Sequence, residues 1–320
     1  MNTAIIGAGA VGLALGSCLH RAGEPVRFAV RQGSGRHAIE DRGLLRGGIF
    51  GDVRVEARDV EVLHGIGELY RAHIDFLLVC TKSTASAEVA RALERIWGSL
   101  RGTPRLVLCQ NGWGNAEVFA AHIPRHRIYN GRVITGFRRT LPHAVEITVH
   151  ADAIRIGSLF GADTAPLQRL CEAISRGGVP CQLTAEIEKD LWAKVLYNCL
   201  LNPLGALVGV PYGALGERPQ TRAILRAVAT EIFAVLARAG FQTHWSSAEE
   251  YLEAFYRQFL PPTALHESSM LQDLRAGRRT EIDVLCGAVA ELAERHAVPA
   301  PVNRALALLI RAAEGRSHPA

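Results

Sequence analysis

Lysine is the scarcest charged residue of this chain. Lysine and arginine together number 36, yet only Lys82, Lys189 and Lys194 are lysines. Arginine stays charged and presents a planar fork, whereas a lysine amine is compact and its pKa is readily tuned for proton transfer. The scarcity therefore favours specific roles for the lysines that remain. Lys189, between Glu188 and Asp190, is interpreted as a surface charge.

Aromatic residues and blocks of basic residues are also scarce. Aromatic residues make up 6% of the chain, and the net charge of +5 is spread over interspersed arginine and glutamate. This argues against nucleic-acid binding, for which basic tails and recognisable motifs are typical. The positive excess instead favours anionic small molecules.

The cysteines lack the C-x-x-C spacing of metal and redox sites, so we expect no metal. Most of the seven stand among apolar neighbours and are interpreted as reduced core residues, which is typical of a cytoplasmic protein. They are Cys18, Cys80, Cys109, Cys171, Cys181, Cys199 and Cys286.

Membrane insertion is not expected from either long apolar stretch. No lysine or arginine precedes the first, which ends at Cys18, so we do not interpret it as a lipoprotein signal. From Lys194 to Glu217 the chain is uncharged over about the length that spans a bilayer, but Pro203 and Pro211 interrupt it. This stretch predicts a buried helix followed by a turn.

The order of apolar patterns predicts two domains. Residues 1–184 alternate strand-like and helical patterns, which is typical of an α/β domain with a Rossmann doubly wound sheet. Residues 185–320 are predicted to form an all-helical domain, with residues 315–320 as a frayed tail. The predicted strands are Thr3–Ile6, Pro25–Val30, Asp75–Cys80, Arg105–Cys109, Tyr129–Thr135, Val145–Val149 and Ala153–Ile156. The predicted helices are Gly12–Ala22, Ser86–Ile96, Glu186–Leu201, Thr221–Ala239, Ala248–Phe259, Met270–Ala276, Glu281–Ala297 and Val302–Ala313.

A glycine-rich turn follows the first predicted strand and opens the first predicted helix. It reads Gly7-Ala8-Gly9-Ala10-Val11-Gly12 and matches G-x-G-x-x-G in the context that makes the pattern credible. The first glycine allows a tight turn, the second lets a pyrophosphate approach the backbone, and the third lets helix and strand pack closely. The turn predicts a dinucleotide at the helix N-terminus.

Cofactor choice is expected to depend on the end of the second strand, where NAD enzymes carry an acidic residue. Arg31-Gln32 occupies that place, and we expect no carboxylate nearby that would repel a 2′-phosphate. A guanidinium can hold a 2′-phosphate with paired hydrogen bonds, so the sequence favours NADPH. The alternative is that Arg31 is a solvated surface arginine.

Lys194, Asn198 and Asn202 recur every fourth residue in an apolar helical run, so they share one helix face. They predict either a ligand-binding strip or an interhelical hydrogen-bond network. Because Asn202 precedes Pro203, we expect it in the last turn of its helix.

Several ordered motifs resemble the ketopantoate reductase family over essentially the whole chain. Leu191-Trp192-Ala193-Lys194, Asn198 and Asn202-Pro203-Leu204 are similar to its catalytic helix. Ser268 to Asp273 and Thr280 to Asp283 are similar to a second signature, and Thr81-Lys82-Ser83 and Asn111 to Asn115 to its nicotinamide-side loops. Gln110, where some members have His, and the bulky Trp113 depart from the pattern and put substrate size in doubt.

The resemblance implies a catalytic role for two residues. Lys194 would donate the proton to the ketone oxygen, and Glu281 would orient substrate or lysine. Asn198, Asn202 and Ser269 would bind the substrate. The local pattern leaves helix-end roles open as well, because Ser269 with Gln272 fits a capping box and Glu281 suits a first helical turn.

For the cofactor, the resemblance implies contacts from three residues besides the glycine-rich turn. Asn111 would lie near both the nicotinamide and the reacting carbonyl, while Lys82 and Arg31 would contact cofactor phosphate or ribose. The bound cofactor would be NADPH.

The implied activity is reduction of 2-dehydropantoate to pantoate, as in pantothenate biosynthesis. Reduction of another small keto acid and a non-catalytic NADPH sensor are the alternatives. The expected partner is a keto acid, with no nucleic acid and no membrane, for a monomer or homodimer.

Overall fold

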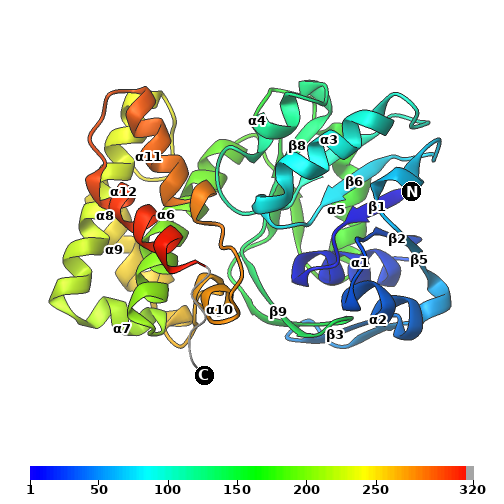
Figure 1. Ribbon diagram of the computed structural model, residues 1–320, viewed down its shortest axis with the longest axis horizontal. Coiled ribbons are helices and arrows are strands. Elements are labelled where there is room, and N and C mark those ends of the chain that lie inside the picture. Colours follow the sequence, from blue (N-terminus) through cyan, green and yellow to red (C-terminus); the bar gives the residue numbers. More distant parts are fainter. Residues whose placement is uncertain (315–320) are drawn as a thin grey trace. The chain divides into compact units, whose positions relative to one another are not determined.

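The computed structural model describes residues 1–314 (Figure 1). The predicted tail at 315–320 lies outside them. The chain forms two compact units. We name them the sheet unit, Met1–Gln110 with Asn115–Ile187, and the helical unit, Asn111–Gly114 with the chain from Glu188 onward. A short segment after one strand of the sheet thus belongs to the helical unit.

The sheet unit is built on an eight-stranded sheet of order β12-β11-β8-β7-β6-β1-β2-β5. The strands from β5 to β8 are mutually parallel, while β11 runs antiparallel to β8. The chain goes from β1 to β2 on one side and β6 lies on the other, so strand order reverses at β1, where such sheets bind ligands. The predicted fold class is confirmed. The strands are β1 (Thr3–Ile6), β2 (Val26–Ala29), β5 (Val60–Leu63), β6 (Phe76–Val79), β7 (Arg105–Leu108), β8 (Ile128–Arg132), β11 (Ile154–Gly157) and β12 (Cys181–Leu183).

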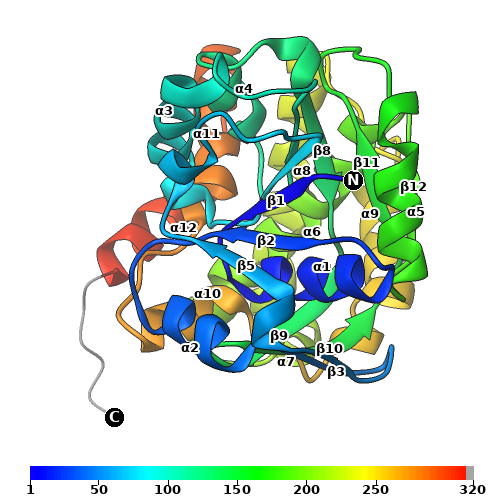
Figure 2. The same ribbon diagram turned by 90° about the vertical axis from the view of Figure 1, so that its right-hand side faces the viewer.

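Helices cover both faces of this sheet (Figure 2). Because side chains alternate along a strand, Ile5 of β1 packs on one face with α1 (Ala10–Arg21) and α5 (Gln168–Arg176). Its neighbour Ile6 packs on the other face with α3 (Ser86–Trp97) and α4 (Asn115–Ala120). The strands are therefore buried on both sides, which explains their continuous apolar runs.

A second sheet of the same unit has the order β4-β3-β10-β9. It comprises β3 (Leu44–Gly48), β4 (Val53–Val55), β9 (Thr135–Leu141) and β10 (Ala144–His150), and α2 (Ser34–Arg42) precedes it in the chain. The predicted single strand Tyr129–Thr135 is wrong at its end, because β8 stops at Arg132 and Thr135 begins β9.

The helical unit contains only helices and turns among its described residues (Figure 1). Predicted helix Ala248–Phe259 changes to π-helix at Phe255, and predicted helix Glu281–Ala297 begins with a 3₁₀ turn before its α-helix. The helices are α6 (Ile187–Val208), α7 (Tyr212–Glu217), α8 (Pro219–Ala239), α9 (Ala248–Ala254), α10 (Ser269–Arg275), α11 (Cys286–Arg295) and α12 (Pro301–Ala313).

Helix α6 is long and apolar enough to cross a membrane, but 72% of its most apolar window is buried within the protein. The predicted buried helix followed by a turn is confirmed. Its predicted end is wrong, because α6 continues past Pro203 to Val208 and Asn202 is not in the last turn. Proline lacks the N–H that would bond the Cys199 carbonyl four residues earlier. The Cys286 thiol of α11 donates to that carbonyl instead, at 3.8 Å.

Glu231 of α8 secures the start of α12. Its carboxylate accepts the backbone N–H groups of Val302 and Asn303 at 2.8 and 2.9 Å, and the Asn303 amide at 2.8 Å. The cap residue of α12, Ala300, has no side-chain acceptor of its own. A carboxylate at this place also suits the helix dipole.

We expect Glu231→Ala to lower the free energy of unfolding of the helical unit by about 2–3 kcal/mol, because it leaves partly buried donors unpaired. Urea unfolding followed by far-UV circular dichroism measures this. Glu253→Ala, which removes only an exposed pair with Arg257, is the matched control and should cost under about 0.5 kcal/mol. Equal losses in both variants would contradict the capping role.

Candidate functional site

The glycine-rich turn between β1 and α1 has the geometry expected for its first and third glycines. Gly7 has φ +100°, which side-chain-bearing residues rarely adopt. A Cβ on Gly12 would lie 2.1 Å from the Gly7 carbonyl oxygen and 3.3 Å from the Cys80 Cβ. The missing side chain at Gly12 thus lets α1 begin directly against the turn and the end of β6.

Gly9 is different, because neither its backbone nor its neighbours require a glycine. Its φ is −77°, and the nearest heavy atom to a Cβ built there is the Cys80 carbonyl oxygen at 3.7 Å. Gly9 precedes the first turn of α1, whose N–H groups have no partners within the helix. Because Gly9 has no side chain beside these donors, a pyrophosphate could approach the backbone there.

Arg31 lies just beyond β2, where the ribose of a dinucleotide is expected. Its guanidinium forms a 3.0 Å ion pair with Glu88 of α3. The expectation that no carboxylate lies near Arg31 is therefore wrong. The fold brings Glu88 next to Arg31, although the two residues are 57 positions apart in the chain. Both side chains are exposed, so such a pair contributes little stability and its partners can be exchanged.

Lys82 lies in the loop after β6, and Gln110 at the end of β7 fixes that loop. The Gln110 amide donates to the carbonyl oxygens of Thr81 and Lys82 at 3.1 and 3.3 Å. It also donates to the Ser86 hydroxyl, which in turn donates to Asn115 at 2.9 Å. Gln110 is thus a positioning residue that the sequence showed only as a departure from the family pattern.

In the helical unit, three of the predicted residues are joined by hydrogen bonds. The Lys194 ammonium donates to Asn111 Oδ1 at 2.5 Å, and Asn111 Nδ2 donates to Glu281 Oε2 at 3.0 Å. An ammonium only donates and a carboxylate only accepts, so the amide between them can be satisfied in this orientation alone. All three side chains are only partly buried, which leaves them accessible to a ligand.

Asn111 is held in the helical unit by the residues that follow it. A Cβ on Gly112, whose φ is +87°, would lie 2.4 Å from the Val284 carbonyl oxygen. The Trp113 N–H donates to that same carbonyl at 2.8 Å, and the Trp113 ring stacks on Trp192 of α6 with centroids 4.5 Å apart. Trp113 is therefore a buried anchor of the segment.

The other predicted substrate residues are not hydrogen-bonded to these three among residues 1–314. Asn198 is half-buried, and Ser269 is exposed at the first position of α10. Asn202 is buried, and its Oδ1 accepts the Tyr212 hydroxyl of α7 at 2.6 Å. Burial raises the pKa of Tyr212, so this hydroxyl stays protonated as a donor. Asn202 thus matches the alternative of an interhelical network.

The predicted capping role of Ser269 is wrong by one residue. Ser268 is the N-cap of α10, and its hydroxyl accepts the Leu271 N–H at 3.0 Å. Ser268 is fully buried, whereas Ser269 is exposed. The helix-end alternative therefore does not account for Ser269.

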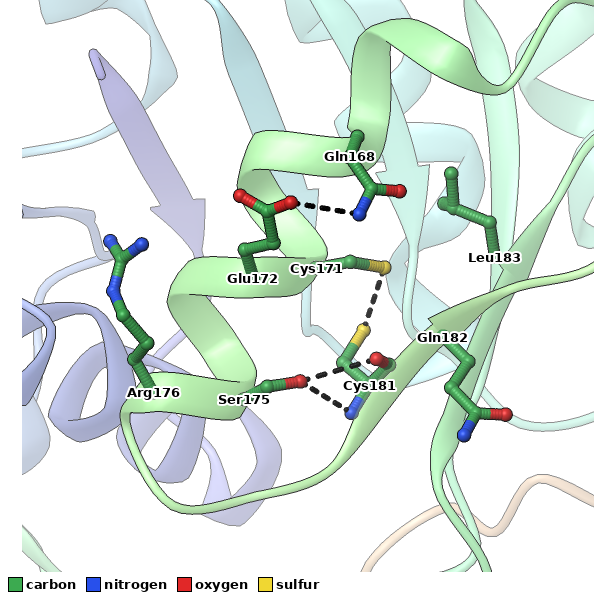
Figure 3. A pocket seen from close by; sticks show the side chains of 8 residues that line it. All are labelled: Gln168, Cys171, Glu172, Ser175, Arg176, Cys181, Gln182 and Leu183. Atoms are coloured by element: carbon green, nitrogen blue, oxygen red, sulfur yellow. Dashed lines mark hydrogen bonds between the residues drawn. The ribbon is translucent and has the colours of Figure 1, made fainter.

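A hollow of about 650 Å³ lies elsewhere in the sheet unit, between α5 and β12 (Figure 3). Cys171 and Cys181 meet there with sulfurs 3.0 Å apart, and all seven cysteines are free and buried as predicted. The neighbouring Cys171 and burial raise the pKa of Cys181, so it stays a thiol. Because a thiolate is the reactive form, Cys181 is not an activated nucleophile.

Two family models match the sequence. One is described as ketopantoate reductase PanE/ApbA and matches residues 3–160, and the other, its C terminal, matches residues 186–314. The 2-dehydropantoate 2-reductase of Aquifex aeolicus is 32% identical over 316 residues, which cover 98% of this chain and 97% of the relative. That of Halobacterium salinarum is 39% identical over 76% of this chain and 77% of the relative.

Solved structures show the same fold over nearly the whole chain. A PanE/ApbA family ketopantoate reductase from Ralstonia eutropha is 28% identical, with 98% of each chain covered and a TM-score of 0.84. A D-mandelate dehydrogenase solved with NADH and anilino(oxo)acetate is 22% identical, with 98% of each chain covered and a TM-score of 0.86. This second likeness concerns the fold alone.

The contrast between Gly9 and Gly12 gives a testable prediction. Gly12→Ala should lower the free energy of unfolding by roughly 1–3 kcal/mol, because its Cβ has no room. Gly9→Ala should change the melting temperature by less than about 2 °C, which corresponds to less than about 0.5 kcal/mol in the free energy of unfolding. The same variant should bind a nicotinamide dinucleotide more weakly than the parent. Thermal melting and fluorescence titration with the cofactor measure the two effects. Normal affinity in a folded Gly9→Ala variant would contradict a ligand at Gly9.

Proposed function

Because the chain belongs to the ketopantoate reductase family, an oxidoreductase family, we propose that it is an NADPH-dependent 2-dehydropantoate 2-reductase. The reaction would reduce the ketone of 2-dehydropantoate to the alcohol of pantoate. The observation that carries the proposal is the hydrogen-bonded chain of Lys194, Asn111 and Glu281 in the helical unit.

Lys194 is the proposed proton donor. When hydride adds to a ketone carbon, negative charge develops on the oxygen, and a nearby ammonium stabilises it and then gives up a proton. The bond to Asn111 Oδ1 fixes the direction of the Lys194 side chain. An ammonium has three N–H donors, and the bond to Asn111 uses one of them.

Glu281 acts through Asn111 in this proposal. Its carboxylate accepts the Asn111 amide, which directs Asn111 Oδ1 toward the lysine. Glu281 is therefore proposed as a positioning residue for the lysine, one of the two roles that the family resemblance implies.

NADPH would supply the hydride from its nicotinamide ring. The residues proposed to hold it are the turn Gly7, Ala8, Gly9, Ala10, Val11 and Gly12, whose bare backbone at Gly9 suits the pyrophosphate. Arg31 would bind the 2′-phosphate, Lys82 would add positive charge from the next loop, and Asn111 would serve the nicotinamide side. Arg31 supports NADPH because its guanidinium can bind a phosphate through paired hydrogen bonds.

Asn198, Asn202 and Ser269 are proposed to bind the carboxylate and hydroxyl groups of the keto acid. Asn198 is one turn beyond Lys194 on the same helix face, and Ser269 is exposed. Asn202 would add an amide donor while its oxygen is bonded to Tyr212. The second candidate function is reduction of another small keto acid. A D-mandelate dehydrogenase has the same fold, and a shared fold does not determine which substrate is bound.

Replacement of Lys194 tests the proposed chemistry. Lys194→Ala should lower kcat by on the order of 10² to 10³, because the developing oxyanion loses its donor. Dissociation constants for NADPH, measured by fluorescence, should change less than about twofold, a difference of about 0.4 kcal/mol. Lys189→Ala, which alters another lysine of the same helix, is the control and should retain turnover. Near-parental turnover by Lys194→Ala would refute the assignment.

A substrate panel separates the candidate functions. Oxidation of NADPH is followed by absorbance with 2-dehydropantoate and then with 2-keto acids bearing smaller or aromatic side chains. The highest kcat/KM is expected with 2-dehydropantoate. A higher value with another keto acid would identify the second function, and cofactor binding without turnover on any of them would indicate an NADPH sensor.

A further inference from the structure

Glu88 stands within ion-pair distance of the cation proposed to recognise the cofactor phosphate. Its Oε2 lies 3.0 Å from Arg31 Nη1, and the two side chains are 60% and 75% exposed. Arg31 follows β2, whereas Glu88 belongs to the first turn of α3, which begins after the Lys82 loop. The connections that follow β2 and β6, the two strands on either side of β1, thus place opposite charges at one point of the sheet unit.

The backbone keeps the negative charge of Glu88 at this place. Glu88 is the third residue of α3, and a carboxylate in the first turn of a helix is stabilised by the helix dipole. The helix therefore fixes the backbone position from which the Glu88 side chain reaches Arg31. A rotation of the Glu88 side chain can break the contact, but its charge stays on the first turn of α3.

The next arginine along the chain after Arg31 is already paired with a carboxylate of its own helix. Arg36, the next arginine along the chain, pairs with Glu40 of α2 at 3.5 Å. Glu40 also accepts His64 at 3.1 Å. A ligand phosphate that reaches Arg31 would therefore meet the Glu88 carboxylate there, while Arg36 is engaged by Glu40.

From these contacts we infer that Glu88 is a specificity-determining residue, which competes with the cofactor 2′-phosphate for Arg31 and so limits the preference for NADPH over NADH. The inference rests on the proposed function, because it takes a nicotinamide dinucleotide as the ligand. A 2′-phosphate must displace Glu88 from Arg31 and remain close to its negative charge. NADH carries an uncharged ribose hydroxyl at that point and meets no such repulsion.

Glu88→Gln tests the competition, because it removes the charge and keeps the size of the side chain. Calorimetric titration with 2′,5′-ADP and 5′-AMP measures binding without any need for turnover. The variant should bind 2′,5′-ADP about fivefold more tightly, as expected for an exposed charge pair. Its affinity for 5′-AMP should change less than about twofold, a difference of about 0.4 kcal/mol. The gain should shrink in 1 M salt, where exposed charges are screened over about 3 Å.

Glu94→Gln is the matched control, since Glu94 is an exposed glutamate of the same helix that pairs with His122. It makes the same change in net charge and should leave both affinities unaltered. Unchanged 2′,5′-ADP binding by Glu88→Gln would overturn the inference, and so would an equal gain in Glu94→Gln. Weaker 5′-AMP binding by Glu88→Gln would also overturn it, because Glu88 would then be a ribose ligand.

Failure of the proposed function gives a different result. If the parent protein binds neither 2′,5′-ADP nor 5′-AMP, no cofactor site exists at Arg31 and the inference falls with it. If binding and its dependence on Glu88 are as expected but no keto acid is reduced, the specificity role stands and the proposed activity fails.

Discussion

The polar centre of the helical unit depends on a close approach of two backbones at Gly112. With φ +87° and no side chain, Gly112 lies where any Cβ would collide with Val284. The Trp113 N–H then bonds the Val284 carbonyl, and the Trp113 ring stacks on Trp192. These contacts hold Asn111 beside Lys194 of α6 and Glu281. A buried aromatic stack and one backbone hydrogen bond thus determine the direction of the Lys194 ammonium.

The fold was predictable where pattern and burial agree. Strands such as Phe76–Val79 are buried on both faces, so they appear as continuous apolar runs, and α8 and α12 follow from helical periodicity. The missed strands are short, partly exposed or glycine-containing, as in Leu44–Gly48 and Val60–Leu63. Such strands are stabilised by pairing with distant segments, which local sequence does not reveal.

The site was predictable as a set of residues but not as a set of contacts. Motifs singled out Lys194, Asn111 and Glu281, yet no spacing indicates that an amide from the end of β7 would bridge lysine and glutamate. The same reason accounts for the Arg31 and Glu88 pair, whose members are 57 residues apart. The prediction that the helix ends near Pro203 is wrong, because the Cys286 thiol donates to the Cys199 carbonyl that proline leaves without its helical partner.

The glycine-rich turn separates the demands of folding from those of ligand recognition. Gly7 and Gly12 serve the chain itself, whereas Gly9 has ordinary backbone angles and open space around it. Stability of the fold therefore requires glycine at two positions of the motif and not at the third. If the proposed dinucleotide binds at this turn, Gly9 is the position at which loss of the ligand would first permit another residue.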